Sequence, residues 1–375
     1  MKKNGKDFSF AVSAAGRVNI IGEHIDYCGG RVLPAALSLK NTVWIRANGT
    51  NRINLSWTDI PDEISLDIDR IESYKGVKYA DYFAACVWAL RETGKKVVGC
   101  DVMSDCRVPF GSGLSSSAAI EVSFIAALLT VAGEPVDRVE VALTALKAER
   151  EFVGMNCGVM DQYASACGKR GRAMLLDCAT LSCEYIPVDL GEYALVIANS
   201  NKPHSLVVSK YNERREESEK ALESIRKRLP IEHLAALTPE DFEKVKDLLS
   251  PVLQKRTCHI VSECARVENA VRAMKAGDAL SLGALLRASH ASLRDLYEVT
   301  GRELDALADA ANAFSGCAGA RMTGGGFGGS AVALVKKGEI AAFETFVAER
   351  YRAAVGYDPS FYSAEIGEGI EIERL

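Results

Sequence analysis

Apolar and polar side chains alternate along the first part of the chain. Residues 7–20 show this alternation, and residues 32–47 and 53–68 return to it. Because successive side chains of a strand point to opposite faces of a sheet, the period of two predicts β-strands. A short apolar run at residues 97–103 predicts a further, buried strand. We therefore expect a sheet built from the first hundred residues.

Helical spacing begins at residues 79–91. Residues 115–132 are apolar on most sides, which predicts a helix in the centre of a first domain. Residues 136–153 predict a second helix with an acidic start. Two strands are then expected, at residues 173–177 and 193–198.

The composition changes near residue 199, where a linker leads into a long charged helix with acid–base pairs at i,i+4 spacing. Helical patterns then dominate as far as residue 314. We therefore expect two domains, residues 1–200 and residues 201–375. The further helices are predicted at residues 239–249, 261–275, 279–293 and 302–314.

The composition excludes some classes of protein. The 375 residues carry 45 basic and 50 acidic side chains, a formal net charge of −5, so bulk charge does not favour nucleic acid as a partner. The 11 cysteines form no C-x-x-C pair, which is typical of thiols in a reducing cytosol. No apolar stretch approaches the roughly 20 residues of a membrane span. We expect a cytoplasmic monomer that binds no membrane.

A glycine- and serine-rich loop, VPFGSGLSSSAA, directly precedes the apolar helix. Glycines allow close approach of the backbone, and the free N–H groups of a helix start favour an anion. The Walker pattern and the G-x-G-x-x-G fingerprint are both absent. An ordinary turn capped by serine is the alternative, although one cap needs only one serine. The candidate phosphate-binding residues are Gly111, Gly113, Ser115, Ser116 and Ser117.

A second loop, GRVNIIGEHIDYCGG, places four chemically active side chains within ten residues: Arg17, Glu23, His24 and Asp26. A solvated charged turn is the alternative, but the flanks of this loop are apolar. Carboxylates accept hydrogen bonds from sugar hydroxyls, and arginine stabilises a developing negative charge. The combination therefore suits a polyhydroxylated ligand.

Three further features indicate a functional site only if the fold brings them close to these two loops. Asp161, in GVMDQ, is either a turn residue or a catalytic group. Glu149 is either a surface glutamate of a helix or a Mg²⁺ ligand. Residues 323–329 hold five glycines, which permits either a flexible turn or a close approach to a ligand or another loop.

In this order, the motifs resemble those of the galactokinases, within the superfamily of galactokinase, homoserine kinase, mevalonate kinase and phosphomevalonate kinase (GHMP). GRVNIIGEHIDYCGG resembles the galactokinase signature, VPFGSGLSSSAA the ATP loop of the superfamily, and RMTGGGFGGSAVAL its third motif. CGVMDQ and NSNKPHSLVVSKYNERR extend the similarity over essentially the whole chain. Three motifs in the right order are far more specific than any one of them.

The resemblance implies a two-domain α/β (α+β) GHMP kinase fold. Its N-terminal domain is similar to ribosomal protein S5 domain 2, its C-terminal domain is ferredoxin-like α+β, and the active site lies in the cleft between them. The implied activity is transfer of the γ-phosphoryl group of ATP to O1 of α-D-galactose, a step of galactose catabolism in the Leloir pathway. The implied ligands are galactose, ATP and Mg²⁺.

The resemblance also assigns roles to individual residues. Asp161 corresponds to the catalytic aspartate, which accepts the proton of the O1 hydroxyl or orients it, and Arg17 to the arginine beside that oxygen. Ser117 and Glu149 correspond to the magnesium site, and Tyr79 aligns less closely with an aromatic residue beside the adenine. The positions implied to contact galactose are Glu23, His24, Asp26, Gly158 and Tyr211.

The sequence departs from the family pattern near the sugar-contacting residues. Family members usually carry Pro at Ala15, Thr at Ile25 and Asn at Cys28. Losing two polar groups there would alter substrate preference, so a related sugar 1-kinase, for N-acetylgalactosamine or arabinose, is one alternative. A non-catalytic sensor of galactose and ATP is another, but the intact SSSAA run and the presence of Asp161 and Arg17 argue against it.

Overall fold

The computed structural model describes residues 2–3, 6–202, 207–363 and 365–375. The largest sheet has six strands in the order β15-β3-β5-β8-β6-β7, and all neighbours are antiparallel except β6 and β8. The alternating segments of the sequence form four of its strands, β3, β5, β6 and β7, and the apolar run forms β8. The strands are β3 (Phe10–Asn19), β5 (Pro34–Ala47), β6 (Arg52–Trp57), β7 (Ile64–Asp67), β8 (Cys100–Cys106) and β15 (Glu371–Arg374).

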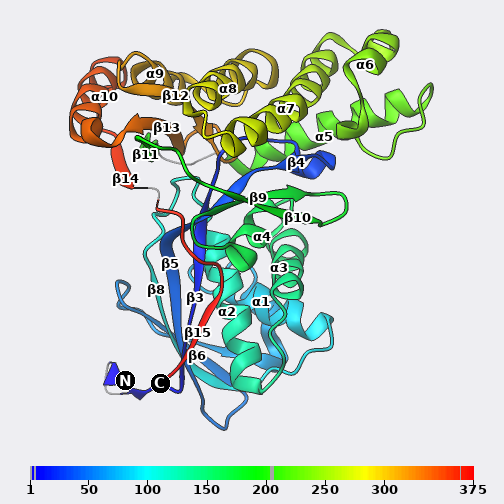
Figure 1. The fold of residues 1–375 in the computed structure, drawn as a ribbon. Coiled ribbons are helices and arrows are strands. Elements are labelled where there is room, and N and C mark those ends of the chain that lie inside the picture. Colours follow the sequence, from blue (N-terminus) through cyan, green and yellow to red (C-terminus); the bar gives the residue numbers. More distant parts are fainter. Residues whose placement is uncertain (1, 4–5, 203–206, 364) are drawn as a thin grey trace.

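Helices cover one face of this sheet (Figure 1). The apolar helix α2 packs on β3 and β5 and is buried on almost every side, as its composition predicts. The predicted helix 136–153 continues from α3 into a π-helical turn, η3. The elements are α1 (Asp81–Glu92), α2 (Ser116–Ala132), α3 (Arg138–Lys147), η3 (Ala148–Val153) and α4 (Met160–Cys167); η2 (Ile68–Tyr74) is a 3₁₀ segment.

A second sheet of four antiparallel strands lies in the other half of the molecule, in the order β12-β13-β11-β14. Helices α8 and α9 pack on its strands, with α10 beside α9 (Figure 1). The strands are β11 (Tyr193–Asn199), β12 (Cys317–Thr323), β13 (Ser330–Lys336) and β14 (Ser360–Ser363). The helices are α8 (Ala279–Ser292), α9 (Arg302–Asn312) and α10 (Ile340–Val355).

A group of helices extends beside the second sheet: α5 (Val207–Arg226), α6 (Pro239–Val245) and α7 (Pro251–Lys275) (Figure 1). Helix α7 begins ten residues before the predicted position, because Ser250 caps it and a proline occupies its first turn. Part of the linker expected after residue 199, residues 203–206, lies outside the described residues.

The smaller strands complete the description. A three-stranded sheet joins β4 (Arg31–Val32), β9 (Arg172–Asp177) and β10 (Cys183–Pro187), and β1 (Lys2–Lys3) pairs with β2 (Lys6–Asp7). None of the helices in the described ranges combines the length and the apolar character that crossing a membrane requires.

The two large sheets exchange strands across the boundary expected at residue 200. Strand β11 precedes that boundary but pairs with β13 and β14 of the second half. Strand β15 follows all the others in sequence but returns to pair with β3 of the first half. The two halves are therefore joined by chain crossings in both directions, and loops from both meet between the sheets.

Candidate active site

Two adjoining pockets lie where these loops meet. The smaller has a volume of about 420 Å³ and the larger about 880 Å³. Both are lined by Arg17, Met155, Asp161 and Gly325, which therefore mark their junction. The smaller pocket is also lined by Glu23, His24, Asp26, Cys157, Gly158, Met160, Tyr211 and Gly324. The larger pocket is also lined by Tyr82, Gly111, Gly113, Ser115, Ser116, Ser117, Gly326, Gly328 and Gly329.

The junction holds a bidentate ion pair between Arg17 and Asp161. Arg17 comes from β3, and its Nε and Nη2 donate to the two carboxylate oxygens of Asp161 at 2.8 and 2.9 Å. Asp161 lies in the first turn of α4. Burial acts to lower the pKa of Arg17, but Asp161 and the other nearby carboxylates outweigh it, so the pKa is raised. Arg17 therefore remains a full positive charge beside Asp161.

Ser115 fixes Asp161 from a third direction. It adopts a φ of 58°, in the left-handed region, immediately before α2. Its hydroxyl donates to Oδ2 of Asp161 at 2.5 Å, and no side chain caps the helix. The alternative of a turn capped by serine is therefore wrong. The Asp161 carboxylate accepts three hydrogen bonds, which hold its orientation.

The glycine–serine loop lines the larger pocket at the start of α2. Gly111 and Gly113 have φ values of 69° and 75°, a conformation that glycine adopts readily. The first N–H groups of a helix have no partner within the helix, and the helix dipole is positive at this end. The loop therefore offers an anion site next to the Arg17–Asp161 pair.

The glycine-rich third motif packs against this loop. A Cβ on Gly324 would lie 2.9 Å from the carbonyl oxygen of Gly113, and one on Gly329 would lie 3.3 Å from that of Ser112. The hydroxyl of Ser330 donates to the carbonyl oxygen of Ser112 at 2.6 Å. The glycines of residues 323–329 thus serve close approach to another loop rather than a free turn.

In the smaller pocket, His24 is a buried and neutral imidazole. Its Nδ1 lies 2.9 Å from the hydroxyl of Tyr27, and its Nε2 has no protein partner within the described residues. Burial, followed by the neighbouring imidazole of His259 and guanidinium of Arg214, lowers its pKa to about 3. The ring lines the pocket, and the backbone of Gly325 is a nearby group that acts to raise its pKa.

Asp26 and Gly158 lie in direct contact across the smaller pocket. A Cβ on Gly158 would lie 1.8 Å from Oδ2 of Asp26, so a larger residue at this position would displace that carboxylate. Burial, and next the charge of Asp161, raise the pKa of Asp26 to about 7. Asp26 is therefore partly protonated near neutral pH when the pocket holds no ligand.

Tyr211 brings the second half of the molecule into the smaller pocket. It lies on α5, with its ring centroid 5.5 Å from that of His24 and 5.6 Å from that of Tyr27. Gly325 lies against its ring, where a Cβ would be 3.2 Å from the ring edge. Aromatic and imidazole rings therefore form one wall of the pocket.

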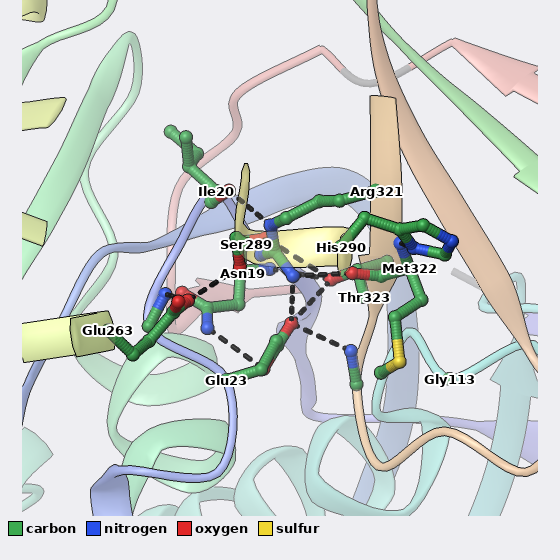
Figure 2. Close-up of polar contacts among 12 residues, drawn as sticks. Asn19, Ile20, Glu23, Gly113, Glu263, Ser289, His290, Arg321, Met322 and Thr323 are labelled. Atoms are coloured by element: carbon green, nitrogen blue, oxygen red, sulfur yellow. Dashed lines mark hydrogen bonds and ion pairs between the residues drawn. The ribbon is translucent and has the colours of Figure 1, made fainter. Parts of the chain in front are cut away.

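The carboxylate of Glu23 accepts several hydrogen bonds from protein groups (Figure 2). Its Oε1 accepts from Arg321 Nη1 at 3.0 Å, Thr323 Oγ1 at 3.1 Å and the Gly324 N–H at 2.8 Å. Its Oε2 accepts from Asn19 Nδ2 at 2.9 Å. Since three of these donors bind Oε1 and one binds Oε2, Oε2 is the oxygen with more room for a ligand donor.

Glu149 lies in the π-helical turn η3 and is buried, not on the surface of a helix. Burial, and next Asp161, raise its pKa to about 7, whereas hydrogen bonding with Ser117 and Gln162 acts to lower it. Gln162 donates to its Oε2 at 2.5 Å. A hydroxyl and a carboxylate are oxygen donors of the kind that Mg²⁺ takes, usually one or two together with substrate phosphates. The residues therefore fit that ion.

The structure brings together every predicted site residue but one along these pockets or directly behind them. The exception is Tyr79, which is 41% exposed and stacks near Trp57 without lining the larger pocket. Tyr82, three residues later on α1, lines it instead. Sequence reasoning missed Tyr82, although its place on an apolar helix face was a usable signal. It also missed Arg321 and Gln162, whose partners are distant in sequence.

Ile25 and Cys28, which motivated the alternative sugar kinases, do not line the smaller pocket. Ile25 is fully buried in the core, and the Cys28 thiol donates to the carbonyl oxygen of His24 at 3.7 Å. Cys28 lines a separate space beside α5. The two departures therefore adjoin residues of the smaller pocket without lining it, and the altered substrate preference stays a prediction.

Comparisons with protein families agree with this arrangement. Residues 2–47 match the galactokinase galactose-binding signature, residues 81–169 the N-terminal domain of GHMP kinases, and residues 270–353 their C-terminal domain. A galactokinase of Clostridium tetani is 45% identical over 357 residues, which covers 94% of this chain and 91% of that protein. A galactokinase of Lactococcus lactis subsp. cremoris is 42% identical, covering 94% of this chain and 90% of that protein.

Solved structures show the same relationship. The crystal structure of Lactococcus lactis galactokinase complexed with galactose is similar with a TM-score of 0.95 and 40% identity, covering 98% of this chain and 96% of that one. The mevalonate kinase of Methanococcus jannaschii shares the fold at a TM-score of 0.65 and 19% identity, covering 97% and 99%. By its near full-length similarity and its signature, the chain belongs to the galactokinase family of the GHMP kinases.

Proposed function

We propose that this enzyme transfers the γ-phosphoryl group of ATP to O1 of α-D-galactose, giving galactose 1-phosphate and ADP. The observation that carries the proposal is the Arg17–Asp161 pair at the junction of the two pockets. The larger pocket ends on a helix N-terminus suited to phosphates, and the smaller on carboxylates and an imidazole suited to hydroxyls. A hydroxyl and a phosphate would therefore meet beside Asp161.

In the proposed reaction, Asp161 receives the proton of the O1 hydroxyl as that oxygen forms its bond to the γ-phosphorus. The bond between the γ-phosphorus and the bridging oxygen breaks, and its electron pair leaves with ADP. Oδ1 of Asp161 accepts one hydrogen bond from Arg17 and retains an acceptor position for that hydroxyl. Arg17 stabilises the negative charge that develops on O1. Phosphoryl transfer depends mainly on such positioning and charge neutralisation.

The smaller pocket would hold galactose through groups on several elements. Asp26 and Oε2 of Glu23 accept hydrogen bonds from hydroxyls, and Nε2 of His24 is the remaining imidazole partner. Gly158 allows the backbone to approach, and Tyr211 covers the pocket from α5.

The larger pocket would hold ATP on the glycine–serine loop, with its phosphates at the start of α2. Ser117 and Glu149 would hold Mg²⁺, which supplies charge neutralisation for the phosphates when it is bound. Tyr79 stays a predicted neighbour of the adenine. We also propose that the enzyme works as a monomer in the cytoplasm, where ATP is available and free thiols persist.

An ADP-release assay over a panel of monosaccharides tests the function. We expect the highest kcat/KM for galactose, with lower values for N-acetylgalactosamine and arabinose. A higher value for either of those sugars would overturn the substrate assignment. Binding of galactose and ATP without any sugar phosphate would instead indicate a sensor.

A further inference from the structure

Arg321 is the largest side chain that is fully buried in the described residues, and the pockets do not include it. It lies on β12 of the second sheet and reaches across to the loop that follows β3 (Figure 2). Its Nε donates to the carbonyl oxygen of Ile20 at 2.8 Å, and its Nη2 donates to that of Asn19. Its Nη1 donates to Glu23 Oε1 at 3.0 Å. One guanidinium therefore fixes both the backbone and the carboxylate of the sugar loop, residues 19–24.

Thr323 at the end of β12 and Gly324 just after it bind the same carboxylate. Thr323 and the backbone of Gly324 both donate to Oε1 of Glu23. Three donors from the second half of the molecule thus saturate one oxygen. Among the described residues, the other oxygen accepts only from Asn19, within the loop itself. The second half therefore determines which oxygen of Glu23 remains available.

The backbone around Glu23 also rests on the second half. The N–H of Gly22 donates to Glu263 on α7 at 3.1 Å, and the carbonyl oxygen of Glu23 lies 3.1 Å from Nε2 of His259. Arg321 differs from these partners because it alone in the described structure places a formal positive charge on the Glu23 side chain. A planar guanidinium with several donors can fix a carboxylate in one orientation, which a lysine cannot do.

We propose that Arg321 is a positioning residue for the sugar: it holds Glu23 so that Oε2 keeps room for a ligand donor toward the smaller pocket. Galactose binding then depends on the contact between β12 and the sugar loop, although Arg321 touches no substrate. The inference rests on the proposed function. The inference extends the proposed function because it assigns galactose affinity to a residue behind the pocket.

The test is a double-mutant cycle with Arg321→Gln, Glu23→Gln and the double variant, in which galactose and ATP dissociation constants are measured by calorimetry. We expect Arg321→Gln to raise the dissociation constant for galactose by about tenfold or more, and that for ATP by less than about twofold, as for loss of one charge-assisted contact. In the Glu23→Gln background, the same change should add less than about twofold, because Arg321 acts through Glu23.

Arg256→Gln is the matched control. Arg256 is also buried and pairs with Glu217 and Glu298, but none of these residues lines the smaller pocket. We expect it to lower the melting temperature while leaving galactose affinity unchanged. Equal losses of galactose and ATP affinity in Arg321→Gln, or additive effects in the cycle, would overturn the inference.

If Arg321→Gln does not fold, Thr323→Val replaces it. This variant removes one neutral donor from the same oxygen of Glu23, so galactose affinity should fall by about threefold while ATP affinity holds. Unchanged galactose affinity would then overturn the inference. A wild-type enzyme that does not phosphorylate galactose would refute the proposed function instead, and the ADP-release assay detects that outcome separately.

Discussion

At the scale of single residues, most side chains predicted from the motifs line the two pockets that meet at one ion pair. Arg17 and Asp161 lie far apart in sequence but make two hydrogen bonds to each other. The buried groups that hold these side chains in place could not be predicted from the sequence. Arg321 and Gln162 act through partners whose proximity only the folded chain creates.

The first prediction concerns Asp161. Asp161→Asn keeps the shape of the side chain but removes the charge that pairs with Arg17 and that would accept the proton in the proposed reaction. We expect kcat to fall by about 10²-fold or more, in the range of general-base contributions, with ATP affinity little changed. Single-turnover kinetics measure the effect, and Asp69→Asn, an exposed position, is the control. A loss within about tenfold would contradict the role of Asp161.

The second prediction concerns Gly158. Gly158→Ala places a methyl group where Oδ2 of Asp26 now lies, at 1.8 Å. The carboxylate must move, so we expect the KM for galactose to rise by about tenfold or more, with the KM for ATP nearly constant. Gly338→Ala is the matched control, since a Cβ there meets nothing within 4 Å. Equal effects of the two substitutions would show that the contact does not matter.

The third prediction concerns the pH dependence of stability in the absence of ligands. The pKa of Asp26 is raised to about 7 by burial and by Asp161, so folding binds a proton and this contribution to stability is lost as pH rises from about 4 to about 7. Asp26→Asn stays neutral. We therefore expect it to raise the free energy of unfolding at pH 8 while weakening galactose binding.

Urea unfolding between pH 5 and pH 8 measures this effect. The advantage of Asp26→Asn over the wild type should shrink below pH 7, by up to roughly 1.4 kcal/mol per pH unit. His24 acts in the opposite direction below its ordinary pKa of 6.5, since its pKa is lowered to about 3, but it is present in both proteins and cancels. Asp62→Asn, an exposed position, should show no such pH dependence. A constant difference would refute the assignment.

At the scale of elements, periodicity was most informative where one face of an element is buried. It predicted β3, β5 and α2 with nearly correct bounds. It did not predict the π-helical turn η3, which places Glu149 in the interior, because a π-turn differs from an α-helix by the register of its hydrogen bonds and not by its apolar spacing. It also predicted β6 and β7 as one continuous segment, because both strands carry the same alternation on either side of their turn.

The fourth prediction concerns the contact between the two glycine-rich loops. Gly329 has a φ of 84° and lies against Ser112. Gly329→Ala introduces strain of about 1 kcal/mol and pushes on the ATP loop. We expect the KM for ATP to rise more than the KM for galactose, as measured in steady-state kinetics, whereas Gly338→Ala should change neither. A larger rise in the KM for galactose than in the KM for ATP would show that this contact acts on the smaller pocket instead.

At the scale of the whole molecule, the change of composition near residue 199 predicted two parts but could not predict how they exchange strands. Amino-acid composition describes each segment by itself. The pairing of β11 with β13, or of β15 with β3, depends instead on hydrogen bonds between distant segments. The closing of the pockets by loops from both halves is likewise a property of the assembled chain.

The fifth prediction concerns the independence of the two halves. A fragment of residues 6–200 contains β11 without its partner strands and leaves the β3 edge without β15. We expect it to be aggregation-prone and rapidly digested by proteases. Residues 6–190 joined to residues 365–375 by a flexible linker should resist digestion better. Equal resistance of the two fragments would show that the exchanged strands contribute little to stability.

The position of β15 also has a consequence for synthesis on the ribosome. The strand that carries Arg17 is translated before its outer neighbour, residues 371–374, and every other strand of the two large sheets lies between them in sequence. During elongation, the exposed edge of β3 is open to pairing with other nascent chains. The edge of this strand therefore gains its partner only after residues 371–374 have been made, which makes a factor that shields nascent strands useful to this enzyme.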